Sequence, residues 1–149
     1  MMLSEFSKVL REKYLFDCWV HPEKVPNLLG EFDVELLPDA GEPDERMVLE
    51  AESLLAFIQN HPDKVVEKVF EHYKQLHDNS EWLASCNVPR NLGVSGLAPY
   101  LHALSISVSR EGEAEDFLYQ GRIYISPQWD EEHAIYLELN ESEIKFCEA

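Results

Sequence analysis

Cysteine is scarce in this sequence, and its placement excludes two common classes of small protein. Cys18, Cys86 and Cys147 are odd in number and lie far apart, so they match neither a disulfide framework nor a zinc-binding pattern. No apolar run approaches the ~18 residues of a membrane-spanning helix, and the N-terminus lacks the pattern of a secretory signal. We therefore expect a cytoplasmic protein with no membrane contact.

Basic residues are also few, with 12 Lys and Arg against 29 Asp and Glu, which gives a net charge of −17. A surface this acidic repels nucleic acid. The chain is nevertheless 45% hydrophobic, which is too apolar for a disordered acidic segment, and 149 residues are the usual size of one domain. We therefore expect a single globular domain, residues 1–149, with an acidic surface.

The negative excess lies in two segments. Residues 31–52 carry a net charge of −8 and residues 111–149 carry −9, while the rest of the chain is neutral. If the two segments adjoin in space, they form one acidic face that attracts a basic protein partner, whereas the alternative is that the charge only keeps the protein soluble. The predicted binding residues are Asp33, Glu35, Glu42, Asp44, Glu45, Glu111, Glu113, Glu115, Asp116 and Glu138.

The spacing of apolar residues predicts an α+β fold. Helical periodicity predicts a helix over about residues 3–14 and two stripes over residues 47–58 and 65–76, with Pro62 separating two helices or kinking one. Alternation predicts a strand in "EFDVELL". A long connection and a short helix capped by Ser95 then precede a C-terminal meander of about four strands, in which Leu104, Ile106 and Val108 alternate with serines. These elements predict helices packed on a mainly antiparallel sheet.

The stretch "SPQWDEEHAIYLEL" contains the residue types of a metal or catalytic site. A small enzyme or metal-binding protein would use His133 with Asp130 or Glu132, and Cys86 is a further candidate nucleophile. However, neighbours on an extended chain point to opposite faces, so four consecutive polar residues cannot converge on one ion. We interpret the stretch as structural, with Trp129 anchoring a turn against the core, and we expect no metal and no cofactor.

The order of "LLGEFDVEL", "VFEHYKQL" and "WDEEHAIYLEL" resembles a family of small uncharacterised bacterial domains with a late Trp-Asp-x-Glu-His element. The resemblance spans roughly residues 28–147, although Ala134 stands where such domains often have glycine. Some similar domains look like toxin immunity proteins, so the resemblance implies an immunity-type inhibitor of a basic bacterial toxin. The residues that carry it are Tyr73, Trp129, Asp130, Glu132 and His133.

Overall fold

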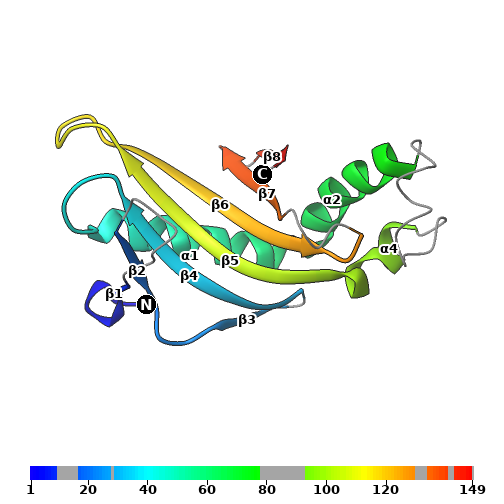
Figure 1. Cartoon of the computed structure of the whole chain (residues 1–149), viewed down its shortest axis with the longest axis horizontal. Helices are drawn as coiled ribbons and strands as arrows, with labels where there is room; N and C mark the ends of the chain where they lie inside the picture. Colours follow the sequence, from blue (N-terminus) through cyan, green and yellow to red (C-terminus); the bar gives the residue numbers. More distant parts are fainter. Residues whose placement is uncertain (10–16, 28, 78–92, 130–133, 141–142, 149) are drawn as a thin grey trace.

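The computed structural model describes residues 1–9, 17–27, 29–77, 93–129, 134–140 and 143–148, and it confirms the predicted α+β class (Figure 1). Helices pack on a mainly antiparallel sheet that ends in a C-terminal meander. The elements are η1 (Leu3–Glu5), β1 (Ser7–Val9), β2 (Cys18–Val20), β3 (Val25–Asn27), β4 (Gly30–Pro38), α1 (Glu45–Asn60), α2 (Pro62–His77), α4 (Val94–Leu97), η2 (Ala98–Tyr100), β5 (Leu101–Glu111), β6 (Leu118–Pro127), β7 (Ile135–Asn140) and β8 (Glu143–Glu148).

The strands follow the order β1-β2-β4-β5-β6-β7-β8, and β3 pairs with the first part of β4. Among the described strands, β4 and β5 form the one parallel pair. Helices α1, α2 and α4 lie between these two strands in the chain, and parallel neighbours require such a crossover connection. The strands from β5 to β8 are joined as successive antiparallel neighbours, as the alternation of apolar residues predicts.

Helix α1 covers β4, β5 and β6 with the apolar stripe that its sequence predicts. Asp44 caps the helix, because its carboxylate accepts the Met47 N–H at 3.0 Å. The helix lies very close to β6 at Gly121, where a Cβ atom would lie 2.5 Å from Leu54 Cδ1. The lack of a side chain at Gly121 therefore sets how closely α1 packs on the sheet. The buried residues of α1 are Met47, Val48, Ala51, Leu54 and Ile58.

The second predicted stripe forms a separate helix. His61 leaves the helical conformation with φ −135° and ψ 52°, and Pro62 then begins α2, so the two stripes belong to two helices. The buried side of α2 carries Val65, Val69 and Tyr73, and the Tyr73 ring lies 5.4 Å from the ring of Trp129, which follows β6. These aromatic contacts join α2 to the sheet.

Three expectations about local structure are wrong. Residues 3–9 form a 3-10 turn and a short strand in place of a helix, because pairing with β2 satisfies the backbone of Ser7–Val9, and within residues 3–9 Phe6 is the one buried residue of that stripe. Gly93, not Ser95, is the N-cap of α4. Leu104 is exposed because the pairing of β5 with β6 shifts between Ala103 and Ser105.

Other expectations concern parts of the chain that the structure does not describe. Residues 10–14 of the predicted first helix and Cys86 lie there. Within the described residues, no helix combines the length and the apolar composition that crossing a membrane demands.

Candidate functional site

The connection between β4 and α1 and the loop between β5 and β6 lie at the same end of the sheet, at the left of Figure 1. Parallel pairing places Pro38 opposite Arg110, so β4 and β5 end together. The Asp39 N–H then donates to the Arg110 carbonyl oxygen at 3.1 Å, which holds the two connections side by side. We call residues 39–46 and 110–117 the acidic end.

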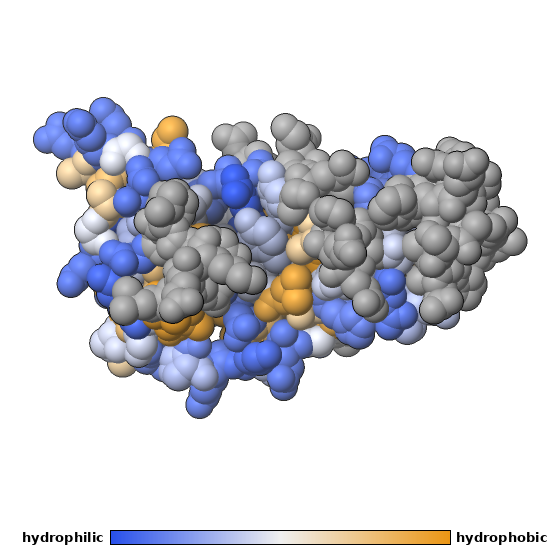
Figure 2. All heavy atoms as spheres, in the orientation of Figure 1, coloured by the Kyte–Doolittle hydropathy of each residue, from blue (hydrophilic) through white to orange (hydrophobic). Residues whose placement is uncertain are grey.

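The acidic end contains eight acidic and two basic residues, a net charge of −6. Figure 2 shows hydrophilic residues gathered where Figure 1 places the β5–β6 hairpin. Asp44 is partly buried, and the other seven acids are exposed to solvent. Six of those seven are predicted binding residues, and Asp39 is the seventh. The exposed acids are Asp39, Glu42, Glu45, Glu111, Glu113, Glu115 and Asp116.

Arg110 organises this end from inside the protein, since it is only 6% exposed. Its Nη1 donates to Asp44 Oδ2 at 2.8 Å, its Nη2 donates to the Ala40 carbonyl oxygen at 2.7 Å, and its guanidinium lies 4.3 Å from the Phe117 ring centroid. The Tyr119 hydroxyl also donates to Asp44 Oδ2, at 2.7 Å. One buried cation therefore joins the turn before α1 to the base of the hairpin.

The electrostatics of Asp44 follow from these contacts. Partial burial acts to raise the pKa of its carboxyl group, but hydrogen bonds from Arg110, Tyr119 and the Met47 N–H outweigh burial and lower the pKa overall. The bond to Asp44 is also the main reason that the pKa of the Tyr119 phenol is raised. Asp44 is therefore a charged residue whose carboxylate is held by contacts within the protein.

The second basic residue of the acidic end also has partners within the protein. Arg46 Nε donates to Glu50 Oε1 at 3.0 Å, and its guanidinium lies 5.7 Å from the Tyr119 ring centroid. Neither arginine therefore pairs with the exposed carboxylates through a contact described here. The negative electrostatic potential of those carboxylates therefore extends into the solvent.

Three of the predicted binding residues do not lie at the acidic end. Asp33, Glu35 and Glu138 belong to the face of the sheet opposite α1, as the pairing register shows. One row across the strands contains Glu35, Ser107, Arg122 and Glu138. Arg122 Nε donates to Glu138 Oε1 at 3.2 Å, so part of this charge is neutralised locally. The predicted single acidic face is thus divided between the sheet surface and the end.

The Trp-Asp-x-Glu-His stretch is only partly described. Trp129 is buried against Tyr73 and His72, in the core. Asp130, Glu132 and His133 lie outside the described residues. In the part of the chain that is described, no three His, Cys, Asp or Glu side chains are grouped closely enough to hold a metal ion.

The sequence reasoning missed the role of Arg110 and Tyr119. A signal was present, because Arg110 continues the alternation of Ile106 and Val108, the phase of β5 that faces the core. A buried arginine needs an anionic partner, and an acidic residue in the connection from the neighbouring strand to the first helix was a natural candidate.

Comparison with known proteins identifies no family for this chain. No family model, curated protein or solved structure matches it.

Proposed function

We propose that this protein is a non-enzymatic binding protein whose acidic end engages a basic protein partner. The observation that supports the proposal is the junction of two acidic connections, far apart in sequence, around one buried arginine. Seven exposed carboxylates share this end, and both of its arginines have partners within the protein. Such a concentration of one sign of charge raises the rate at which an oppositely charged protein associates.

The partner most compatible with this surface is a protein with a cationic face. Nucleic acid and anionic membranes carry the same sign of charge as the acidic end and would be repelled. An immunity-type inhibitor of a basic toxin enzyme is one specific form of the proposal, and a toxin-like reading frame beside the gene would favour it. An operon of metabolic enzymes would favour the alternative, a small enzyme or metal-binding protein that uses His133 with Asp130 or Glu132.

The proposal is tested by the kinetics of binding to the protein that co-purifies from the native host. A variant in which Glu113, Glu115 and Asp116 become Gln, Gln and Asn should associate more slowly by about tenfold at low salt. A matched variant replaces one Asp and two Glu that are exposed on α2, and it should retain the wild-type rate. The α2 residues are Asp63, Glu67 and Glu71.

Salt dependence provides the second arm of the experiment. The Debye length is ~8 Å at physiological ionic strength, so steering by exposed charges should weaken as salt rises. The wild-type association rate should approach that of the hairpin variant at high salt. Equal rates for the hairpin variant, the α2 variant and the wild type at low salt would mean that the acidic surface serves only solubility.

A further inference from the structure

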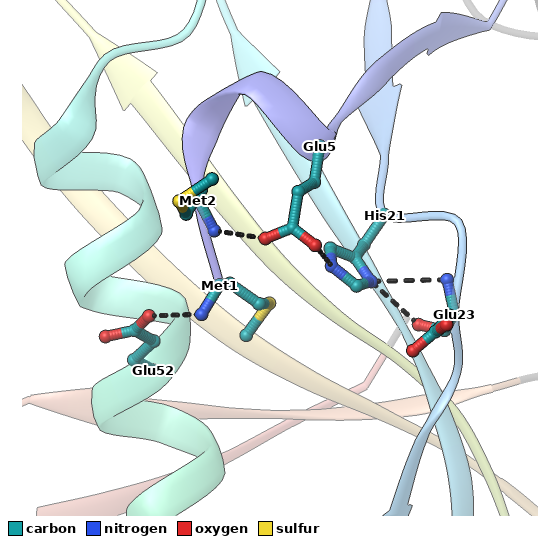
Figure 3. Close-up of polar contacts among 6 residues, drawn as sticks. All are labelled: Met1, Met2, Glu5, His21, Glu23 and Glu52. Carbon is teal, nitrogen blue, oxygen red and sulfur yellow. Dashed lines mark hydrogen bonds and ion pairs between the residues drawn. The ribbon is translucent and has the colours of Figure 1, made fainter.

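His21 is a buried titratable side chain in a different part of the molecule, where β2 leads into β3. It is only 8% exposed, and its backbone N–H donates to the Val34 carbonyl oxygen of β4 at 3.0 Å, so its backbone is fixed to the sheet. The imidazole packs edge-on against the Phe6 ring at 5.3 Å between centroids. Figure 3 shows the ring held between Glu5 on one side and Glu23 on the other.

The Glu5 side of the ring determines where one proton lies. Glu5 Oε2 is 3.4 Å from His21 Nε2, and Glu5 Oε1 accepts the Met2 N–H at 2.6 Å. That backbone hydrogen bond is the main reason that the pKa of Glu5 is lowered, which keeps the carboxylate charged. An unprotonated Nε2 would direct its lone pair at the Glu5 carboxylate, and the two would repel each other. Nε2 therefore carries a proton whether the ring is neutral or cationic.

The Glu23 side of the ring offers two incompatible hydrogen bonds. His21 Nδ1 lies 3.2 Å from the Glu23 amide nitrogen and 3.0 Å from the Glu23 carbonyl oxygen. A bare Nδ1 accepts from the N–H but cannot bond the carbonyl, whereas a protonated Nδ1 donates to the carbonyl and repels the N–H. Because Nε2 is already protonated, the neutral ring must use the N–H and the cationic ring must use the carbonyl.

We propose that His21 is a proton-operated switch for the connection between β2 and β3. When the imidazole is neutral, Nδ1 holds the Glu23 N–H; when it takes up a proton, Nδ1 releases the N–H and holds the Glu23 carbonyl oxygen. Glu23 is exposed, so water can hydrate whichever backbone group is released, and the exchange costs little. The cationic ring also forms an ion pair with Glu5, which fastens the N-terminal segment to β2.

Among the residues that the structure describes, Glu5 is the charged side chain in ion-pair contact with the ring. The packed elements otherwise contribute the Val34 carbonyl from β4, the Phe6 ring and the Glu23 backbone. The other charged groups of residues 1–9 have partners elsewhere: the Met1 amine pairs with Glu52 at 3.0 Å (Figure 3), and Lys8 pairs with Asp17 at 3.2 Å. The switch does not depend on the acidic end.

Nuclear magnetic resonance of 15N-labelled protein tests the switch directly. At pH about 8 the His21 ring should show a protonated Nε2 and a bare Nδ1. On acidification to about pH 5.5, the Glu23 amide proton should move upfield as its hydrogen bond is lost, in step with the His21 ring signals. A neutral ring protonated at Nδ1, or a Glu23 amide that ignores the ring titration, would overturn the proposal.

The control is His21→Asn, in which the amide oxygen can still accept the N–H two residues later, as in an Asx turn, but cannot titrate. The Glu23 amide of this variant should be independent of pH over the same range. A persistent pH response of equal size would assign the change to another group and would overturn the proposal. If the variant does not fold, the tautomer and the amide response of the wild type decide the question alone.

Discussion

Asp44 provides the strongest test of how the acidic end is built. The Asp44→Ala variant loses the cap of α1, which is worth about 1 kcal/mol. It also leaves the Arg110 guanidinium without its carboxylate, and an uncompensated buried charge costs about 3 to 5 kcal/mol. Asp44 is 33% exposed, so water can partly replace the lost carboxylate. We therefore expect unfolding free energy to fall by about 2 to 4 kcal/mol in total.

Asp44→Asn removes the charge of the side chain but keeps its shape. Asparagine is as good a helix cap as aspartate and can still accept the Tyr119 hydroxyl, so this variant should lose about 1 to 2 kcal/mol. Urea unfolding followed by circular dichroism measures both losses. Asp39→Ala is the control, because Asp39 contacts Arg110 through its backbone N–H, and it should change stability by less than about 0.5 kcal/mol. Equal stabilities of the wild type and both Asp44 variants would refute the reasoning.

The pH dependence has a definite sign. The folded protein lowers the pKa of Asp44, so the unfolded state binds a proton more readily than the folded state. The stabilisation by Asp44 is therefore fully present above the unfolded value of about 3.9 and is lost as the pH falls through the lower folded value. The stability difference between wild type and Asp44→Asn should be constant at neutral pH and should shrink in acid. A difference that grew in acid would contradict the assignment.

Three further predictions concern the core and the candidate metal ligand His133. Gly121→Ala should cost about 1 to 3 kcal/mol because the new methyl group meets Leu54, and adding Leu54→Ala should cost less than the sum of the single changes. Trp129→Ala should lower the unfolding free energy by about 3 to 5 kcal/mol, whereas an unchanged melting temperature would contradict the burial of this ring. Metal analysis of untagged protein should find no stoichiometric metal, and a bound metal lost on His133→Ala would support the enzyme or metal-binding alternative.

The sequence predicted those parts of the fold that have long periodic patterns. The stripes of α1 and α2 and the alternation of β4 to β7 extend over enough residues to distinguish a helical period from a strand period. The strands β2 and β3 have three residues each, which is too short for any period to appear. Over residues 3–9 the apolar spacing is helical, but pairing with β2 decides the structure of β1.

For the candidate site, the sequence predicted the charge of the two segments but not the contacts between them. Local composition identified both acidic segments, but their contact depends on the parallel pairing of β4 with β5, which joins residues about 70 positions apart. Strand register decides which predicted binding residues lie at the acidic end and which lie on the sheet face opposite α1. Amino-acid composition does not determine register. The ion pair between Asp44 and Arg110 follows from that register as well, since it requires Arg110 to point toward α1.

The exposed acids of the hairpin should contribute nothing favourable to folding, and this separates their role from that of Asp44. Glu113, Glu115 and Asp116 are exposed and belong to an end with a net charge of −6, so repulsion between like charges opposes the folded state. Replacing them with Gln, Gln and Asn should leave stability unchanged or raise it, and any gain should disappear at high salt because screening removes the repulsion. Urea unfolding at low and high salt measures this. A clear loss of stability at both salt concentrations would show that these acids hold the hairpin together. A gain would mean that the charge is retained at the expense of stability, as expected for a surface used in binding.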